Sequence, residues 1–510
     1  MNRGKKAIYN SAASLLAEGI AIVCGFILPR LILSSFGSNY NGLTQSVTQF
    51  LSVVALLRAG VGGATRASLY KTLANKDEKQ LSATIRATEL FMRKVALIFA
   101  AFVIVFSCIY PLVVSNDFGW LFSATLVLII AVSTFVEYYF GITYHILLQA
   151  DQKQYISSLL GSGTTILNTL LSVILIKLGC GIHIVKLGSA AAFCVTPIVL
   201  NRYAKAHYHI DKSIEPDFSS INQRWNAMLH QVAGFIYSNT DIMVITIFLN
   251  LKEVSVYSVY CLVSNGLKRL MTTVTTGVEA AFGDMIARGN DEVLTENVKV
   301  YETLLHSIVC ILFGTALILI SPFVGVYTRG IHDVNYLRPA FGYLLLITEV
   351  VHILRQPYHS IVEASGHYKQ TKHIAFTQAI LNLGISIILI NIMGLNGVII
   401  GTLISDIYRG IAYRIYVKKN ILHSLTNTDI IKRITVSAVT ILLIVLISNY
   451  LPHRAIDDYW AWVIYAIPVT ILSITITLIL NYVFYKNDVE KLIKKLKNSL
   501  NAIIHKNREK

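Results

Sequence analysis

Charged residues are scarce in this chain, and acidic residues are fewer than basic ones. Only 14% of the 510 residues are charged, and 44 Lys and Arg face 28 Asp and Glu. Soluble domains carry about 25% charged residues because their surfaces contact water. The deficit excludes an ordinary soluble protein, and the 54% of hydrophobic residues indicates a membrane environment.

Metal-binding and nucleotide-binding motifs are also missing. Cys180 lies in a short connecting segment, and the other five cysteines lie in apolar stretches, at Cys24, Cys108, Cys194, Cys261 and Cys310. None has a metal-ligand spacing or an obvious disulfide partner. No G-x-x-x-x-G-K-[ST] phosphate-binding loop occurs. We therefore expect a protein without a metal site or cofactor, and not an enzyme.

Long apolar stretches occupy nearly the whole chain. A helix needs about 20 residues to cross a hydrocarbon core of about 30 Å, because it must pair every backbone amide internally. The predicted spans are residues 8–34, 42–66, 90–114, 119–146, 155–178, 184–202, 226–249, 254–286, 300–327, 335–364, 371–393, 396–417, 431–451 and 459–484. The sequence thus predicts an all-α integral membrane protein with about 14 transmembrane helices.

Basic residues are concentrated in alternate loops between these spans. The series begins with Arg3, Lys5 and Lys6 and ends in a lysine-rich tail. Basic residues near span ends are retained in the cytoplasm, so both termini are predicted to be cytoplasmic. This bias also accounts for most of the formal charge of +16, and we expect no nucleic-acid partner.

An ungapped repeat relates two parts of the chain at an offset of 214 residues. The matched residues are Tyr144, His145, Ala150, Ile166, Leu167, Asn168, Ser172, Leu175 and Ile176, which recur as Tyr358, His359, Ala364, Ile380, Leu381, Asn382, Ser386, Leu389 and Ile390. Six spans separate equivalent helices, so both halves cross the membrane in the same direction. Such halves are related by an axis near the membrane normal and enclose a central site.

The repeat and a polar seam near residues 203–224 define the predicted domains. These are an N-terminal six-helix lobe at 1–212, a C-terminal six-helix lobe at 213–429, two additional transmembrane helices at 430–486 and a basic tail at 487–510. The leucine spacing in the tail is typical of an amphipathic helix on the anionic inner leaflet. A solvated charged tail is the alternative interpretation.

Cationic residues inside the spans are the candidates for substrate binding. A charge at the bilayer centre costs at least about 2.5 kcal/mol, so it should face a cavity or a partner. The candidates are Arg58, Lys268, Arg269, Arg355 and Arg30. The alternative for each arginine is a buried carboxylate partner or snorkelling to headgroups, and snorkelling is favoured for Arg30 near the outer end of its span.

Two of these cations lie beside residues that disturb helices. Arg58 is close to Gly60, Gly62 and Gly63, where we expect the second span to bend or to pack tightly. Arg355 precedes Pro357, which lacks an amide hydrogen and should kink the tenth span. A kinked helix that carries a cation indicates a moving gate.

Three carboxylates are candidates for ion coupling or ion pairing. Asp241 follows Asn239 and Thr240 inside the seventh span, where it can pair with an arginine, bind a cation or take up a proton. Glu18 lies in the first span. Glu349 lies six residues before Arg355 and does not share its helical face, so it is predicted to form a separate site.

Several segments resemble a known family. These are Leu57-Arg58-Ala59-Gly60-Val61-Gly62-Gly63-Ala64 with Ser68-Leu69-Tyr70-Lys71, then Thr240-Asp241-Ile242-Met243-Val244, and Val256-Tyr257-Ser258. Together they resemble the Wzx-type polysaccharide and oligosaccharide flippases of the multidrug, oligosaccharidyl-lipid and polysaccharide (MOP) exporter superfamily, over essentially the whole chain. The resemblance implies a V-shaped, MATE-like pair of six-helix lobes in the bacterial cytoplasmic (inner) membrane. Its implied cargo is an undecaprenyl-diphosphate-linked oligosaccharide that moves to the outer leaflet by alternating access.

Such a cargo is chemically compatible with the cationic spans, because arginine offers planar, permanently charged donors to diphosphate oxygens. The other expected partners are membrane lipids, H⁺ or Na⁺ as coupling ions, and polysaccharide assembly proteins. A cation-coupled multidrug exporter and a lipid II flippase are the closest alternatives. A membrane polymerase or glycosyltransferase would need a substantial outer loop with catalytic charges, which the sequence lacks, and a non-transporting scaffold is a further alternative.

Overall fold

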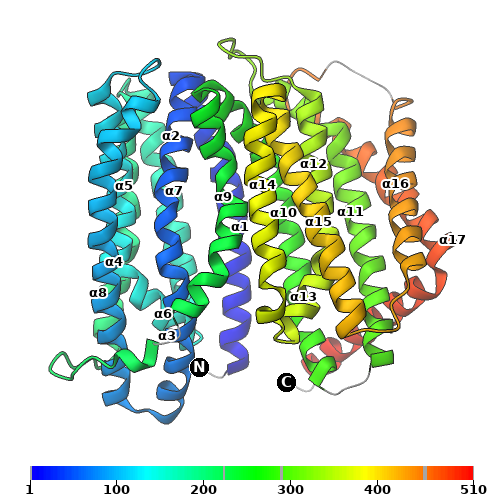
Figure 1. Cartoon of the computed structure of the whole chain (residues 1–510), viewed down its shortest axis with the longest axis horizontal. Helices are drawn as coiled ribbons and strands as arrows, with labels where there is room; N and C mark the ends of the chain where they lie inside the picture. Colours follow the sequence, from blue (N-terminus) through cyan, green and yellow to red (C-terminus); the bar gives the residue numbers. More distant parts are fainter. Residues whose placement is uncertain (1–2, 222–223, 288–290, 452–455, 509–510) are drawn as a thin grey trace. The chain divides into compact units, whose positions relative to one another are not determined.

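The computed structural model describes residues 3–221, 224–287, 291–451 and 456–508, and the regular structure within these ranges is helical throughout (Figure 1). The α-helices are α1 (Arg3–Phe36), α2 (Ser38–Leu51), α3 (Ala55–Asn75), α4 (Glu78–Val113), α5 (Trp120–Val136), α6 (Ile142–Ala150), α7 (Gln154–Lys177), α8 (Ile182–His207), α9 (Arg224–Phe248), α10 (Leu251–Ala287), α11 (Asp291–Tyr327), α12 (Pro339–Leu354), α13 (Gln356–Ala364), α14 (Tyr368–Met393), α15 (Leu395–Asn420), α16 (Asn427–Ser448) and α17 (Tyr459–Arg508). Short 3₁₀ turns are η1 (Ser52–Val54) and η3 (Phe218–Ile221), and η2 (Glu137–Gly141) is a π-helical turn.

Each predicted span coincides with one of these helices or with consecutive helical segments, which confirms the predicted fold class. In the described ranges, 9 helices are long and apolar enough to cross a membrane by length and composition. The other predicted spans contain α3, α9, α10, α12 with α13, and α15. In α9 the described apolar stretch is Val232–Phe248, because the side chains before it lie outside the described part of the chain. Most of the predicted binding residues lie in the α3, α10 and α12–α13 spans.

The order of the helices follows the 214-residue repeat. The first residues of α11, α14 and α15 follow those of α4, α7 and α8 by 213, 214 and 213 residues. In both halves the fourth span is interrupted at the same place, because Gly141 at the end of η2 and Arg355 between α12 and α13 are repeat equivalents. The duplication therefore extends to the position of an irregular turn.

The two interruptions have different local causes. Pro357 is the second residue of α13, and the chain leaves α12 after Leu354, which confirms the predicted kink. The first half has no proline there and forms the π-helical turn η2 instead. A Cβ atom on Gly141 would lie 2.5 Å from Cβ of Pro197 on α8, so only glycine permits this approach.

The described chain divides into two compact units. The first comprises Met1–Ser258 with Gly330–Val334, and the second comprises Val259–Arg329 with Asn335–Lys510. This division differs from the predicted lobe boundary at 212/213, because α9 packs onto α2 and α3. Gln49 donates to Asn239 at 2.6 Å and Thr246 donates to Ser46 at 2.8 Å, which ties α9 into the first unit.

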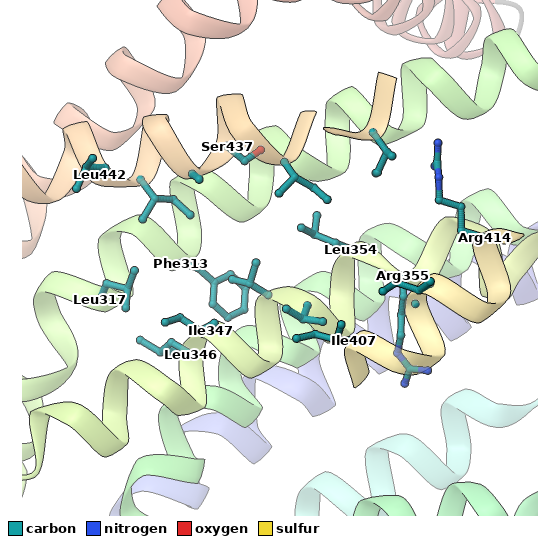
Figure 2. A pocket seen from close by; sticks show the side chains of 18 of the residues that line it. Phe313, Leu317, Leu346, Ile347, Leu354, Arg355, Ile407, Arg414, Ser437 and Leu442 are labelled. Carbon is teal, nitrogen blue, oxygen red and sulfur yellow. The ribbon is translucent and has the colours of Figure 1, made fainter. Parts of the chain in front are cut away.

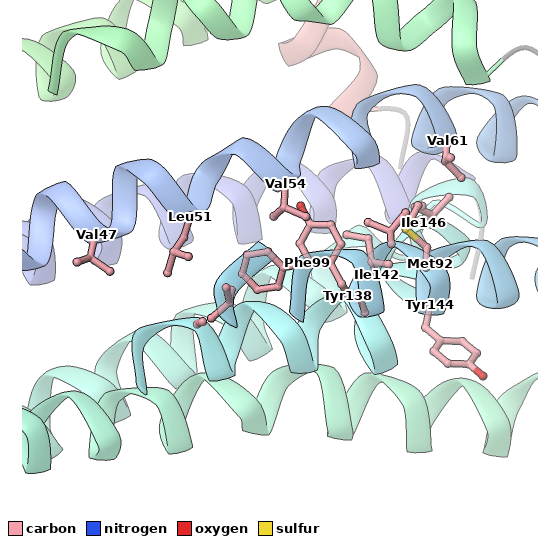
Figure 3. Packing of buried hydrophobic residues seen from close by; sticks show 14 of the residues in the cluster. Val47, Leu51, Val54, Val61, Met92, Phe99, Tyr138, Ile142, Tyr144 and Ile146 are labelled. Carbon is pink, nitrogen blue, oxygen red and sulfur yellow. The ribbon is translucent and has the colours of Figure 1, made fainter. Parts of the chain in front are cut away.

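The core of the first unit lies between α2, α3, α4, α5, η2 and α6 (Figure 3). Val47 and Leu51 project from α2, while Phe99 on α4 and Tyr138 on η2 stack with ring centroids 6.4 Å apart. Ile142 extends the cluster along α6. The interrupted fourth span is thus packed into the core rather than left at its edge.

A close helix contact at the start of α2 joins repeat-equivalent residues within the first unit. Asn41 donates to Ser255 at 2.8 Å, and these positions are 214 residues apart. A Cβ atom on Gly42 would lie 1.8 Å from the carbonyl oxygen of Leu251, so the contact requires glycine. Asp333 accepts hydrogen bonds from the backbone amide and hydroxyl of Ser38, at 2.7 and 2.6 Å, and so satisfies the N-terminus of α2.

The prediction of a bend or tight packing at Gly60–Gly63 stays a prediction, because the surroundings of Gly60 lie outside the described part of the chain. Helix α3 is continuous from Ala55 to Asn75, and no described atom outside the helix lies within 4 Å of a Cβ placed on Gly62 or Gly63. The irregular turn in this span is η1, which precedes Arg58. Glycine permits a bend but does not impose one, and continuous hydrogen bonding inside the helix is the better solution in hydrocarbon.

The second unit includes the two helices beyond the repeat. Helix α17 packs on α11, where Thr315 donates to Ser473 at 3.0 Å and Asn481 donates to Ser307 at 2.8 Å. The backbone of α17 is non-helical at Tyr485, and its last part includes the predicted tail. The apolar side chains that define the predicted amphipathic face beyond residue 495 lie outside the described residues.

A charged cluster outside the spans fastens the N-terminus of α1 to the α6–α7 connection. Asp151 accepts hydrogen bonds from Lys6 at 3.1 Å and from Tyr208 at 2.6 Å, and it pairs with Lys153 at 2.7 Å. Burial raises the pKa of Asp151, but the hydrogen bonds from Lys153, Tyr208 and Lys6 outweigh burial and hold this pKa below its ordinary value.

Replacement of Asp151 by Asn tests this cluster. A carboxylate whose pKa is lower in the folded state than in the unfolded state stabilises the folded state at pH values above the unfolded-state pKa. That stabilisation is lost as the pH falls through the folded-state pKa. We expect the mutant to unfold at a lower temperature than the wild type at pH 7, and the difference to shrink below about pH 4. Thermal unfolding of the detergent-solubilised chain measures this; a pH-independent difference would contradict the assignment.

Candidate functional site

Arg58 pairs with a carboxylate that the sequence did not connect to it. Its Nη1 lies 3.4 Å from Oε1 of Glu137 on η2, and both side chains are about half exposed, at 45% and 49%. Exposed pairs with one long contact contribute little to stability where water reaches them, about 0–1 kcal/mol. The pair therefore positions the guanidinium without binding it tightly.

Lys268 and Glu349 form a corresponding pair in the second unit. Nζ of Lys268 lies 2.9 Å from Oε1 of Glu349, and the exposed fractions of the side chains are 39% and 11%. The cation lies on α10 and the carboxylate on α12. Two predicted site residues thus contact each other, whereas the sequence assigned them to separate sites.

The two pairs share an architecture without being copies. Each joins a cation on the second span of a repeat to a carboxylate on the fourth span, in η2 or shortly before the break at Arg355. The repeat equivalents of the first pair are Thr272 and Val351, which carry no charge. An ion pair therefore connects the same two spans in both halves. Lys268 lies four residues before the equivalent of Arg58, and Glu349 lies two residues before the equivalent of Glu137.

Arg355 is buried and anchored to α15. It is 5% exposed, its Nε lies 3.4 Å from Oδ1 of Asp406, and its Nη2 lies 3.0 Å from Nδ1 of His352. Asp406 is fully buried and also accepts a hydrogen bond from Gln378 at 2.8 Å. The predicted kink at Pro357 thus lies beside a cation that is held within the second unit, and a moving gate at this position stays a prediction.

The remaining predicted residues lie on α1, α9 and α10. Arg30 is half-buried on α1, Glu18 is exposed on the same helix, and Arg269 is exposed beside Lys268 on α10. Asp241 on α9 accepts a hydrogen bond from the hydroxyl of Tyr257 at 2.9 Å. That contact holds the carboxylate between α9 and α10, and the three predicted roles of Asp241 stay open.

Sequence reasoning missed a second set of buried charges. Arg409 follows Asp406 by one helical turn and donates to Gln378 at 2.6 Å, so the i, i+3 spacing on α15 could have revealed it. Glu302 on α11 pairs with Arg433 at 3.2 Å and lies 3.9 Å from Arg414. No sequence signal connects these three residues, because they come from α11, α15 and α16.

Within the described ranges, no three His, Cys, Asp or Glu side chains gather in a geometry that could hold a metal ion. The candidate site consists instead of cation–carboxylate pairs that join α3 to η2 and α10 to α12. Exposed pairs of this kind can exchange one anion for another, because the incoming anion replaces the carboxylate beside the same cation.

Comparison with known proteins gives a fold relationship. No known protein-family profile and no curated protein sequence matches this chain. Among solved structures, the lipid II flippase MurJ in an inward closed conformation is similar, with a TM-score of 0.67, 15% identity, and 94% of this chain and 100% of that chain covered. An inward-facing MATE multidrug-resistance transporter of the MOP superfamily is similar with a TM-score of 0.57 and 14% identity, over 80% and 96% of the two chains.

The chain adopts the MOP exporter fold. A eukaryotic MATE transporter with a TM-score of 0.57 and 16% identity agrees, over 86% of this chain and 98% of that one. The resemblance inferred from sequence is thus confirmed at the level of the fold. Within this MOP fold, the predicted cations lie on the second, eighth and tenth spans, and Arg30 lies on the first.

The buried pair Arg355–Asp406 and the exposed pair Arg58–Glu137 of this MOP-fold protein should differ in their contribution to stability. Replacing Arg355 by Met leaves the buried Asp406 without its pair, which should cost about 3–5 kcal/mol. Replacing Arg58 by Met breaks an exposed pair and should cost less than about 1 kcal/mol. Thermal unfolding in detergent measures both, and equal effects would contradict this division. Adding Asp406→Asn to Arg355→Met should restore part of the lost stability.

Proposed function

We propose that this protein is a flippase that moves an undecaprenyl-diphosphate-linked oligosaccharide from the inner to the outer leaflet during surface polysaccharide synthesis. The observation that carries the proposal is the placement of exchangeable cations on equivalent spans of a MOP fold, at Arg58 and Lys268. Arg269 lies beside the second of these. Fixed cations suit an anionic headgroup better than a cationic drug.

In the proposed cycle, the diphosphate replaces the carboxylates that hold the cations when cargo is absent. The Arg58–Glu137 contact is 3.4 Å long and half exposed, so its loss is inexpensive. Arginine then offers the diphosphate paired donors in place of lost hydration. Once the diphosphate displaces it, Glu349 can take up H⁺, and this protonation would couple transport to a proton gradient. Asp241 and Glu18 are further candidates for ion coupling.

Membrane potential favours the proposed direction of transport. Movement of negative charge outward follows an inside-negative potential, which contributes about 2.3 kcal/mol per charge per 100 mV. The proposal therefore needs no nucleotide hydrolysis. The proposed location is the bacterial cytoplasmic membrane with both termini in the cytoplasm, and polysaccharide assembly proteins are the expected partners.

A lipid II flippase is the second candidate function, favoured by the TM-score of 0.67 to the lipid II flippase MurJ. Both cargoes present a polyprenyl diphosphate, so the cationic residues serve either one. The cargoes differ in the attached sugars, and a transport assay with both lipids separates them. Preference for lipid II would select this second function.

Replacement of both Arg58 and Arg269 by Ala should abolish flipping. The variant removes two residues that we propose to donate to the headgroup. It also removes the partner of Glu137, which should destabilise the fold little because the Glu137 side chain is exposed. Purified protein in vesicles that contain a lipid-linked oligosaccharide is assayed by the accessibility of the sugar to an external enzyme. Arg58→Lys keeps the charge but loses the planar fork, so it should retain part of the activity.

Arg202→Ala on α8 is the matched control, because Arg202 lies near the end of its helix and outside the proposed path. Its flipping rate should equal that of the wild type. Membrane abundance and elution as a single species must be the same for all variants. Unchanged flipping by the double variant would overturn the proposed role of these arginines.

A further inference from the structure

A large apolar pocket lies within the second unit, and Arg355 is the one predicted site residue among those that line it. Its volume is about 690 Å³, and α11, α12, α13, α15 and α16 supply its walls. Leu317 and Leu442 lie at one end and Arg414 lies at the other, with Phe313 between them (Figure 2). Small-molecule sites range over about 300–1,000 Å³, so the pocket is large enough for a ligand.

The pocket is open along one side to the surroundings of the unit. Ile347, Ile411, Ile434 and Leu442 line it and are 44%, 56%, 51% and 56% exposed. They lie on segments of α12, α15 and α16 that are predicted to span the bilayer. Exposed isoleucine and leucine on such segments contact hydrocarbon, so a ligand can enter the pocket directly from the lipid phase.

The interior offers almost nothing to a polar occupant. Ser437 lines the pocket, but its hydroxyl already bonds to Nδ1 of His306 at 2.7 Å. The guanidinium of Arg355 extends away from the apolar side chains and pairs with Asp406 (Figure 2). Ordered water needs two to four polar partners, so water does not fill this space favourably. A hydrocarbon chain does.

One end of the pocket is cationic. Nη2 of Arg414 donates to the carbonyl of Thr426 at 2.6 Å, immediately before α16, and Nη1 donates to Tyr358. Nε of Arg414 is buried and has no hydrogen-bond partner among the described residues. Lys418, one turn further along α15, donates to Asn427 at 3.3 Å. An anion at this end would meet Lys418 and the guanidinium of Arg414, whose Nη1 also lies 3.9 Å from Oε1 of Glu302.

We propose that this pocket binds an acyl chain of an anionic phospholipid, with the phosphate beside Arg414. The lipid belongs to the leaflet on the side where α15 ends, which is cytoplasmic in the orientation predicted from loop charges. It fills the space between α16, which lies beyond the repeat, and the helices of the repeated part. The proposal is independent of the transported cargo.

Photolabelling of the full-length protein in lipid nanodiscs tests the occupant. The probe is phosphatidylglycerol with a diazirine at the end of one acyl chain, and peptide mass spectrometry locates the label. We expect labels on residues that line the pocket, such as Leu317. Ala438 lines the pocket and is exposed, so Ala438→Trp should fill the space and lower labelling at least roughly tenfold.

Leu446→Trp is the matched control, because Leu446 is an exposed residue of α16 outside the pocket, and it should label like the wild type. Labelling that does not fall in Ala438→Trp would overturn the proposal. So would displacement of the label by an equimolar polyprenyl phosphate, which would assign the pocket to a cargo tail.

The headgroup is tested by the same diazirine chain on phosphatidylcholine. The wild type should label several-fold more with phosphatidylglycerol, and Arg414→Gln should remove that preference while retaining label in the pocket. A preference that survives in Arg414→Gln would refute the role of Arg414. If that variant does not elute as a folded species, the comparison of the two lipids on the wild type decides: equal labelling overturns the anionic headgroup.

Discussion

Hydrocarbon offers no hydrogen-bond partner to a backbone amide and no hydration to a charge, and this constraint organises the whole chain. It requires continuous helices, and it confines irregular turns to places where a neighbouring helix compensates. The π-helical turn that ends at Gly141 packs against Pro197 on α8, and the break at Arg355 is held by Asp406 on α15. Each interruption of a fourth span therefore lies against the sixth span of its own repeat, which is α8 in the first half and α15 in the second.

The same constraint sorts the charged side chains into two groups. Arg355 and Asp406 are almost fully buried, so their pair exchanges hydration for hydrogen bonds and belongs to the structure of the second unit. Arg58 and Lys268 are part-exposed and pair with single carboxylates. Such cations are the ones that we propose to contact another anion. The distinction depends on exposure, and charge within a span does not by itself indicate a binding residue.

Local sequence information was enough to predict the spans, the repeat and the kink at Pro357, because hydropathy and a missing amide act within one helix. It was not enough to predict partners. Glu137 lies 79 residues from Arg58, and only the packing of the second span against the fourth brings them together. The glycines after Arg58 leave their packing undecided for the same reason, since a small residue forms a close contact only where a neighbouring helix supplies one. The compact units likewise depend on where α9 packs.

The contact between Asn41 and Ser255 has a consequence for how the two halves diverged. A residue that touches its own repeat equivalent occupies a place where, in a symmetric dimer, two identical side chains would meet. Identical asparagines there would each have to act as donor and acceptor in the same confined space. With both copies in one chain, one position is serine and the other is asparagine, and Gly42 allows the backbones to touch. Fusion thus permits a directional hydrogen bond that a symmetric interface could not specify.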